Sequence, residues 1–403
     1  MHAFSELLQR SQAFGWVAFI VTVFLTPLAM RAAYRFRVLD VPDQKLKPHA
    51  RPIPYLGGTA IAAGWAAALG AAMFAGSCNT SVLLPLLLGG LAMSVLGLVD
   101  DVRGLSPKTR LAVGATIITA TLLNTGVGFE LVDSILAGAS AVFGLDLHLP
   151  PPVSVSLSVA ASLFIVLGAC NSTNLIDGLD GLCSGVTALI ALGFFALASH
   201  LALWGYSTLG DPVRLVLAIA MCGAAVGFLP WNFNPAKIFM GDAGSVLLGY
   251  NCGILILLFA ERGNFRWVIA ALMIFALPVF DTALAMFRRW RAGRSIFEGD
   301  RSHFYDQLVQ RGLSIRQTVV VCYALTLAYA AIGLLMIWMR IAPDGRVVPM
   351  IRTRHAVPLY VGVCILTGLL AWWAGLTHPE EPRATANRER GTGNGEPGTG
   401  NGG

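Results

Sequence analysis

The chain has 403 residues, of which 56% are hydrophobic and only 12% are charged, and its mean hydropathy is +0.68. Charged residues make up about a quarter of an ordinary soluble domain, so this composition excludes one and indicates an integral membrane protein. The excess of six positive charges does not indicate nucleic acid as a partner, because Lys and Arg concentrate in the cytoplasmic loops of membrane proteins.

Apolar stretches recur along the chain between short polar loops. A bilayer core about 30 Å thick needs roughly 20 apolar residues per helix, and about eleven stretches approach this length. They cover roughly residues 12–30, 56–75, 82–99, 111–127, 155–170, 184–203, 214–230, 244–260, 267–286, 317–339 and 356–376. The sequence therefore predicts an all-α, polytopic helical membrane protein with about eleven transmembrane helices.

Composition divides the chain into two parts. Residues 1–377 contain every apolar stretch and form the predicted membrane domain. Residues 378–403 repeat the sequence GTGNG and lack large apolar side chains, so we expect this tail to be disordered and to carry no chemistry. The seven cysteines show no paired spacing, which argues against both a disulfide framework and a zinc site.

Basic loops predict the orientation of the membrane domain. Arg and Lys concentrate after the first and the ninth predicted spans, and such loops are typically cytoplasmic. Alternation then places the loops after the third, fifth and seventh spans on the same face. The loop 340–355 also carries several arginines but falls on the outer side, so the topology of the last two spans stays open.

Five polar clusters interrupt the apolar pattern, and all of them fall on the predicted cytoplasmic face. They are "DVPDQKLKPHARPIPYLGG" (40–58), "DDVRGLSPKTR" (100–110), "NSTNLIDGLDG" (171–181), "WNFNPAKIFMGDAGS" (231–245) and "DTALAMFRRWRAGRSIFEGDRSHFYDQL" (281–308). Each cluster alone has a simple structural explanation, such as a helix cap, an interhelical hydrogen bond or a basic loop. Those explanations do not predict their coincidence on one face, which favours a shared active site at the cytoplasmic surface.

The residue types in these clusters indicate phosphoryl transfer. Aspartates supply the oxygen ligands that Mg²⁺ prefers, while Arg, Lys and helix N-termini bind phosphate. A prenyltransferase DDxxD motif is excluded because Val102, Arg103 and Gly104 follow the aspartate pair, and a CDP-alcohol phosphotransferase DGxxAR motif is excluded because "LCSG" follows Asp180-Gly181. A phosphorylated soluble donor and a lipid acceptor therefore fit the pattern.

Three motifs, "LGLVDDVRGLSP", "NSTNLIDGLDGL" and "NPAKIFMGDAGS", resemble the signatures of the polyprenyl-phosphate N-acetylhexosamine-1-phosphate transferases, glycosyltransferase family 4. The resemblance covers roughly residues 35–315. It implies that an undecaprenyl-type polyprenyl phosphate attacks the β-phosphorus of a UDP-N-acetylhexosamine, which yields a lipid diphosphosugar and UMP and keeps the sugar's configuration. It also implies a bacterial inner membrane location with the active site facing the cytoplasm.

The resemblance further implies roles for single residues. Asp100 and Asp101 match the aspartate pair that handles the lipid phosphate, and His303 matches the first histidine of a cytoplasmic motif, so these three are the catalytic candidates. Asp242 matches the ligand of Mg²⁺, for which Mn²⁺ is a substitute, and Asn232 is a candidate support for the metal region.

The remaining candidates concern the substrates. The implied nucleotide-sugar pocket contains Asn174, Asp177, Asp180 and Phe239, and Arg301 is added as a physical candidate for a phosphate contact. Lys45 and Lys47 are the corresponding candidates for the lipid phosphate. All three basic residues also have the simple explanation of marking a cytoplasmic loop.

One departure from the family bears on the donor. Relatives carry further histidines after the first, whereas this chain has Phe304, Tyr305 and Asp306. The histidine run typical of the peptidoglycan branch is absent, which favours a UDP-GlcNAc-type donor. UDP-GalNAc and deoxy-aminosugar nucleotides remain alternatives.

Two other classes of protein compete with this interpretation. An ion-coupled secondary transporter also places acidic residues inside helices, but its sites lie near the middle of the membrane between repeats, and no repeat is visible here. A non-enzymatic scaffold would not need the carboxylates together with the histidine. The partners expected are polyprenyl phosphate, the UDP-sugar and the lipid bilayer, but no nucleic acid; a homodimer is left open.

Overall fold

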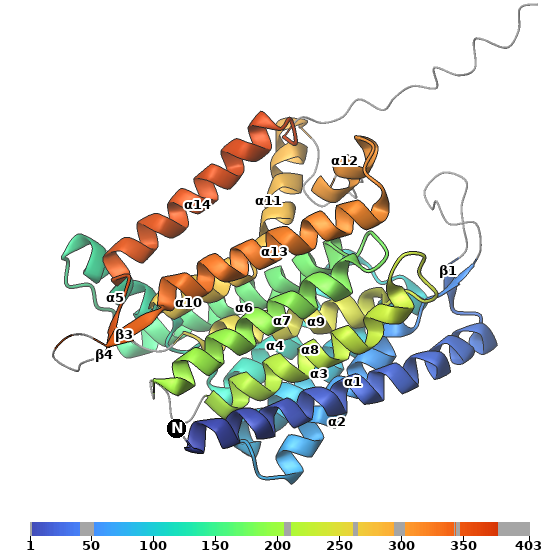
Figure 1. Cartoon of the computed structure of the whole chain (residues 1–403), viewed down its shortest axis with the longest axis horizontal. Coiled ribbons are helices and arrows are strands. Elements are labelled where there is room, and N and C mark those ends of the chain that lie inside the picture. The colour runs from blue at the N-terminus through green and yellow to red at the C-terminus, as the bar shows by residue number, and fades with distance from the viewer. Residues whose placement is uncertain are drawn as a thin grey trace, which may run out of the picture.

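A computed structural model describes residues 2–40, 52–204, 211–260, 265–293, 303–341, 343 and 347–377. Over these ranges the chain forms a bundle of roughly aligned helices with very little sheet (Figure 1). This confirms the predicted fold class. The tail 378–403 lies outside the described residues, so its expected disorder stays a prediction.

The long helices follow the apolar stretches of the sequence. They are α1 (His2–Phe36), α2 (Gly57–Phe74), α3 (Thr80–Arg103), α4 (Pro107–Thr125), α6 (Pro151–Leu175), α7 (Leu182–Leu203), α8 (Asp211–Asn232), α9 (Gly241–Leu258), α10 (Phe265–Ile274), α11 (Ala276–Arg291), α13 (Ile315–Ile337) and α14 (Thr353–Trp373). Each predicted span coincides with one of these helices or, for 267–286, with the pair α10 and α11.

The number of helices suited to cross a membrane is slightly smaller than predicted. Within the described ranges, nine helices are long and apolar enough, and the pair α10 and α11 counts as a tenth if it forms one span. The predicted span 111–127 falls on α4, which is not among them. Its first turn carries Lys108 and Arg110, and these charges lower the hydropathy of the whole helix.

The ninth predicted span is broken rather than straight. Helices α10 and α11 meet at Phe275 with a bend of 72°. Pro278 lies in the first turn of α11, where backbone N–H groups have no intrahelical acceptor, so the break accommodates the proline. The bend carries α11 out of line with the bundle (Figure 1).

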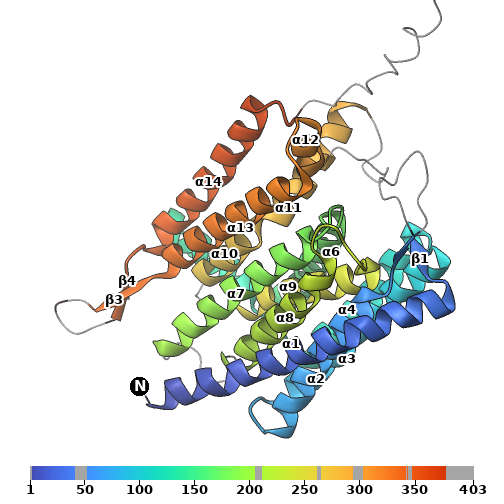
Figure 2. The same ribbon diagram turned by 45° about the vertical axis from the view of Figure 1, so that its right-hand side comes forward.

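Short elements mark the two ends of the bundle. Strand β1 (Leu39–Asp40) pairs antiparallel with β2 (Ile53–Pro54) near the end of α1, and α12 (Phe304–Gln310) lies at the same end (Figures 1 and 2). Helix α5 (Leu131–Phe143) and the hairpin of β3 (Met339–Ile341) and β4 (Val347–Pro349) lie at the opposite end, near the N-terminus. The arginine-rich loop 340–355 is therefore opposite to β1 and α12, as alternation of the spans predicted.

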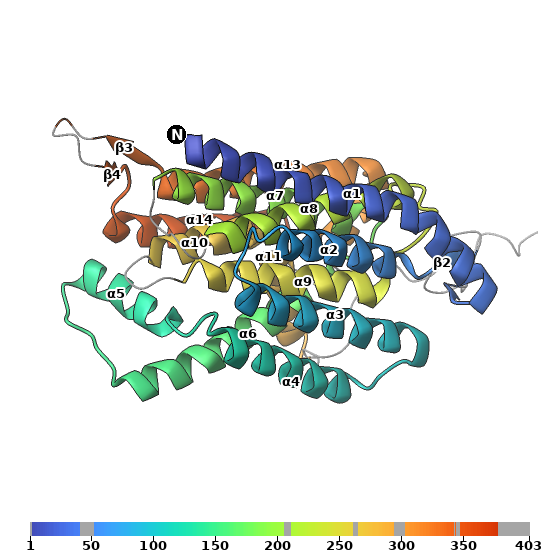
Figure 3. The ribbon, with the colours of Figure 1, turned by 90° about the horizontal axis from the view of Figure 1, so that it is seen from below.

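Helix α9 occupies the centre of the bundle, where α2, α3 and α6 pack around it (Figure 3). Sixteen of its residues, from Gly241 to Leu257, are buried. Glycines permit the close approach: a side chain at Gly97 of α3 would collide with the backbone of Asp242, and one at Gly249 of α9 would collide with α6 at Cys170. Small residues play this part in membrane bundles because lipid supplies no hydrophobic force between helices.

We expect Gly97→Val to destabilise the protein by about 1–3 kcal/mol, because the added atoms force α3 away from the start of α9. Thermal unfolding in detergent would show this as a lower melting temperature. The matched control is Gly168→Val on α6, since no atom lies within 4 Å of a Cβ there. Equal melting temperatures for the two variants would contradict this account of the α3–α9 contact.

Candidate active site

Carboxylates from three places in the sequence converge at the end of the bundle that carries β1. Asp100 and Asp101 end α3, Asp177 and Asp180 lie in the turn between α6 and α7, and Asp242 begins α9. A cavity of about 610 Å³ opens beside them. It is lined by Phe36, Arg37, Val38, Leu39, Asp40, Tyr55, Asp100, Asp101, Val102 and Asp242.

Asp101 holds the start of α9. Its Oδ1 accepts a hydrogen bond from the backbone N–H of Asp242 at 2.9 Å, and its Oδ2 accepts one from the N–H of Ala243 at 3.1 Å. The residue that precedes α9, Met240, offers no side-chain cap. A carboxylate from another helix thus satisfies two of the free amides and complements the positive end of the helix dipole.

Arg110 joins two of the carboxylates. One of its nitrogens, Nη1, lies 3.0 Å from Oδ2 of Asp100 and 2.8 Å from Oδ2 of Asp242. Sequence reasoning missed this residue, although it is the last one of the cluster 100–110. Gly104 ends α3 in a left-handed conformation and Ser106 caps α4, so the chain reverses within a few residues and brings Arg110 back to Asp100.

Asn174 completes the hydrogen bonding of Asp242. Its Nδ2 donates to Oδ1 of Asp242 at 2.6 Å and to Oγ of Ser245 at 3.1 Å. Asp242 therefore accepts from Asn174 on one oxygen and from Arg110 on the other. Two residues predicted for different parts of the site, the nucleotide pocket and the metal site, are in direct contact.

Asp177 differs from its neighbours because it accepts no hydrogen bond within the described part of the chain. It is half-buried in the turn between α6 and α7. Burial, followed by the negative charges of Asp242, Asp101 and Asp180, raises its pKa to about 8. An ordinary aspartate has a pKa near 4, so burial in the first place, and the neighbouring carboxylates in the second, favour the protonated form of Asp177.

Asp180 and Asn232 join the loop after α8 to the turn between α6 and α7. Oδ2 of Asp180 accepts from Nδ2 of Asn234 and from the N–H of Ala236, both at 2.9 Å. The buried Asn232 accepts from the N–H of Gly181 at 3.1 Å and donates to the carbonyl of Ile238 at 3.1 Å. Both residues therefore fix the loop after α8 against the turn that carries Asp177.

Phe239 lies in that same loop, just before α9. Its backbone N–H donates to the carbonyl of Pro54 at 2.9 Å, and its carbonyl accepts from the N–H of Gly57 at 2.9 Å. Its ring meets Tyr55 edge to face, with centroids 6.4 Å apart. Because Tyr55 lines the cavity, Phe239 lies at the border of the carboxylate site.

His303 lies at the same end of the bundle and is buried at the start of α12. Its Nδ1 is 2.7 Å from Oδ2 of Asp281 on α11. Of the other candidates, Lys45, Lys47 and Arg301 lie outside the described residues, so their phosphate contacts stay predictions.

No group of three or more His, Cys, Asp or Glu side chains in the described ranges is arranged to hold a metal ion. Asp242, the predicted metal ligand, and Asp177 are near enough for the charge of Asp242 to raise the pKa of Asp177. Mg²⁺ in phosphoryl-transfer sites is usually bound by one or two carboxylates, with substrate phosphates and water as the other ligands. The residues present therefore fit a magnesium ion that arrives together with a phosphorylated substrate.

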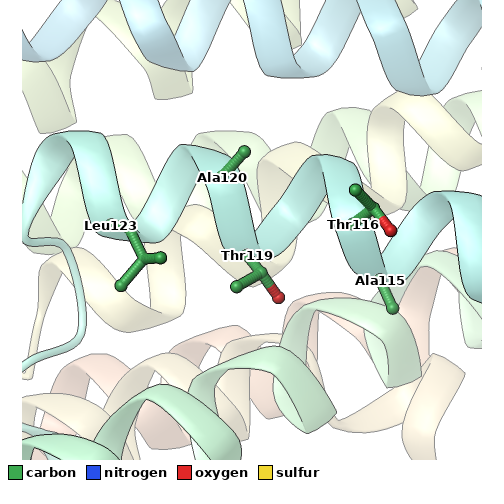
Figure 4. Close-up of a pocket in the computed structure, with 5 residues that line it drawn as sticks. All are labelled: Ala115, Thr116, Thr119, Ala120 and Leu123. Atoms are coloured by element: carbon green, nitrogen blue, oxygen red, sulfur yellow. The ribbon is translucent and has the colours of Figure 1, made fainter.

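A second hollow, of about 430 Å³, lies on α4 and has a different character (Figure 4). Its lining residues, Ala115, Thr116, Thr119, Ala120 and Leu123, all belong to that one helix. None of these five residues carries a charged side chain, whereas aspartates line the first cavity. The acidic cavity is the candidate active site.

Comparison with known proteins shows the family of this chain. The model of "Glycosyl transferase family 4" matches residues 83–260. The probable undecaprenyl-phosphate N-acetylglucosaminyl 1-phosphate transferase of Bacillus subtilis is 32% identical over 317 residues, which cover 76% of this chain and 80% of that protein. The chain belongs to glycosyl transferase family 4. This confirms the resemblance inferred from the motifs.

Other members of the family 4 transferases are similar over comparable lengths. The decaprenyl-phosphate N-acetylglucosaminephosphotransferase of Mycolicibacterium smegmatis is 32% identical over 331 residues, or 77% of this chain and 78% of that protein. A phospho-N-acetylmuramoyl-pentapeptide-transferase of Staphylococcus aureus is 28% identical over 339 residues, or 80% and 97%. The family model ends at residue 260, before α10, so Asp281 and His303 lie beyond it.

Asp101→Asn should lower stability as well as activity. An asparagine has one acceptor oxygen in place of two and no charge, so the start of α9 loses part of its cap. We expect a loss of about 1 kcal/mol, as for other helix caps, measured as a lower melting temperature. Asp146→Asn is the control, because the Asp146 side chain is 89% exposed in the loop after α5. Equal melting temperatures would contradict a capping role.

Asp177→Asn should instead raise stability, increasingly so at higher pH. The pKa of Asp177 is higher in the folded than in the unfolded chain, so the wild-type protein loses stability as the pH rises from about 4 to about 8. The variant lacks this dependence. In EDTA, the melting temperature of the variant minus that of the wild type should therefore grow between about pH 5 and pH 8. A difference that stays constant with pH would contradict the raised pKa of Asp177.

Proposed function

We propose that this protein transfers N-acetylglucosamine 1-phosphate from UDP-GlcNAc to an undecaprenyl-type polyprenyl phosphate, which yields a polyprenyl diphosphosugar and UMP. The observation that carries the proposal is that Asp100, Asp101 and Asp242 line one cavity at an end of the helix bundle. Arg110 pairs with Asp100 and Asp242, and Asp177 is near enough to interact with the charges of Asp242 and Asp101. Membership of family 4 and the activities for which the relatives are named support it.

The cavity suits an acceptor that arrives from the bilayer. Phe36, Val38 and Leu39 give it an apolar wall, whereas Asp100 and Asp101 give it an acidic one. A polyprenyl chain can contact the first wall while its phosphate approaches the second. Because a phosphate monoester loses its second proton near neutral pH, the aspartate pair needs to accept little more than a residual proton.

The charges in the site call for a cation. Asp100, Asp101, Asp177 and Asp242 carry four negative charges when ionised, and Arg110 carries one positive charge. Both substrates bring further negative phosphates, which such a site would repel. A magnesium ion held by Asp242 and Asp177, with manganese as a substitute, would supply the missing positive charge and stabilise the charge that develops on the leaving phosphate.

The residues of the chain position this chemistry. Asn174 and Arg110 fix the two oxygens of Asp242, and Asp101 fixes the backbone from which Asp242 projects. A bond forms between an oxygen of the lipid phosphate and the β-phosphorus of the donor, and the bond from that phosphorus to the bridging oxygen of UMP breaks. The anomeric carbon does not react, so the sugar keeps its configuration.

The family allows several donors, and two observations favour GlcNAc. The B. subtilis and M. smegmatis relatives are named for N-acetylglucosamine. This chain also has Tyr305 and Asp306 in place of the further histidines expected in the peptidoglycan branch. UDP-GalNAc-type and deoxy-aminosugar donors remain the alternatives within the same reaction.

We place the enzyme in a bacterial plasma membrane with the carboxylate end facing the cytoplasm. The basic residues predicted for that face support this orientation. The location of the carboxylates at one end of the bundle, away from its middle, argues against an ion-coupled transporter. A homodimer stays an untested expectation.

The direct test is UMP release by purified protein supplied with undecaprenyl phosphate, Mg²⁺ and a panel of UDP-sugars. We expect release with UDP-GlcNAc, a loss of at least about 100-fold in excess EDTA, and a similar loss for Asp242→Asn. Asp146→Asn should keep full activity. Full turnover in EDTA would refute the metal, and no release from folded protein with any donor would refute the transferase and favour the transporter.

A further inference from the structure

Asp281 is a completely buried carboxylate on α11. Its Oδ2 lies 2.7 Å from Nδ1 of His303, and its Oδ1 accepts the backbone N–H of Phe304 at 3.0 Å. A buried charge is costly unless it is paired and hydrogen-bonded. Asp281 meets that requirement with the first residues of α12, so it anchors His303 and the start of that helix together.

This contact selects one form of the His303 ring. An ionised carboxylate can only accept hydrogen bonds, so the hydrogen lies on Nδ1. The second ring nitrogen, Nε2, has no hydrogen-bond partner among the described residues. In the neutral ring Nε2 therefore carries a free lone pair.

Tyr305 links this ring to the carboxylate site. Its ring stacks on the imidazole of His303, with centroids 5.4 Å apart and an angle of 6° between the planes. Its hydroxyl donates to the carbonyl of Leu175 at 2.7 Å. Leu175 is the last residue of α6, immediately before the turn that carries Asp177.

Gly178 shows how closely Tyr305 approaches that turn. A Cβ at this position would collide with the Tyr305 hydroxyl. The glycine leaves room for the tyrosine to lie against the backbone between Asp177 and Asp180. The contact therefore depends on two features. The Tyr305 hydroxyl donates a hydrogen bond, and Gly178 has no side chain that would block it.

A second tyrosine holds the far end of the same turn. The hydroxyl of Tyr323 on α13 donates to the carbonyl of Gly181 at 2.6 Å, and Gly185 provides the room for its ring. The turn 176–181 is thus held at both ends by tyrosine hydroxyls from α12 and α13. These helices follow the residues that the family model matches, which end at 260.

We propose that Asp281 and Tyr305 are positioning residues for the transfer reaction. Asp281 holds the His303 imidazole with its hydrogen on Nδ1, and Tyr305 keeps that ring at a fixed place relative to the turn of Asp177. The inference rests on the proposed function, because it assigns His303 and Asp177 to the same bound donor. Misplacement of reacting groups by about 1 Å can cost about 100-fold in rate, which makes such bracing effective.

The proposal accounts for the departure of this chain from its relatives. The family resemblance implies further histidines after the first, and this chain has Phe304, Tyr305 and Asp306 there. These residues do not supply a second imidazole. Tyr305 instead stacks on the ring of His303 and donates a hydrogen bond to the carbonyl of Leu175, next to the turn that carries Asp177.

The first test is Asp281→Asn, which has nearly the same shape. The amide oxygen can still accept the N–H of Phe304, and the amide nitrogen can donate to Nδ1 of His303. Both contacts survive, but the ring hydrogen moves to Nε2. We expect a folded protein with kcat lowered at least about 100-fold, by analogy with aspartates that orient a catalytic histidine, and with a KM for UDP-GlcNAc within about threefold of the wild type. A purely structural Asp281 predicts an unchanged kcat.

The second test is Tyr305→Phe, which keeps the stacked ring and removes only the hydroxyl. We expect faster amide hydrogen exchange in a peptide spanning residues 172–185, and kcat/KM for UDP-GlcNAc at least about tenfold lower, with KM for the lipid unchanged. Tyr329→Phe is the matched control, because this buried hydroxyl donates to Oγ1 of Thr367 at 3.1 Å, between α13 and α14.

The two tests separate this inference from the proposed function. If the wild-type protein releases no UMP, the transferase proposal fails, yet the exchange measurement still decides whether Tyr305 braces the turn. Wild-type kcat in Asp281→Asn, or exchange in Tyr305→Phe equal to that in Tyr329→Phe, would overturn the inference. Should Asp281→Asn fail to fold, the Tyr305→Phe comparison decides alone.

Discussion

The carboxylate of Asp101 accepts hydrogen bonds from the backbone N–H groups of Asp242 and Ala243 at the start of α9. The geometry of the site depends on that contact. Helix α9 is buried almost along its whole length, so its position is set by the helices around it. Its first turn nevertheless needs partners for N–H groups that have none within the helix. Asp101 supplies them from α3, and this places Asp242 against Arg110 and Asn174.

The same arrangement gathers more negative charge than it neutralises. Arg110 bridges Asp100 and Asp242, and backbone amides stabilise Asp101, but Asp177 receives no hydrogen bond from the described residues. Burial, and after it the charges of the neighbouring carboxylates, raise the pKa of Asp177. Under the proposed function, two phosphorylated substrates would bind in this site together with a cation that offsets its negative charge.

Hydrogen bonds from several helices hold the loop before α9 and the turn of Asp177 in place. Asp180 and Asn232 tie the loop before α9 to the turn of Asp177, while Tyr305 and Tyr323 hold that turn from α12 and α13. The bend between α10 and α11 turns α11 out of line with the bundle, and Asp281 on that helix meets His303. The predicted span 267–286 is thus two helices, and the bend between them brings Asp281 to His303.

Hydropathy alone located the helices and excluded a soluble fold, because the length of an apolar stretch is a local property of the chain. It did not reveal that α4 would begin at Pro107 and so include Lys108 and Arg110. Nor did it reveal that α10 and α11 would separate at Phe275. The motifs likewise brought Asp100, Asp101, Asn174, Asp177 and Asp242 together at one end of the bundle, because alternation of the spans fixes which loops share a face.

Only the tertiary structure decided how these residues divide their tasks. Asp101 caps a helix that begins about 140 residues later, Arg110 pairs with Asp242, and Asp281 and Tyr305 orient His303. None of these partners follows from spacing in the sequence. They depend on the distances between packed helices, which are set by where glycines let backbones approach and by which buried polar groups must find a partner.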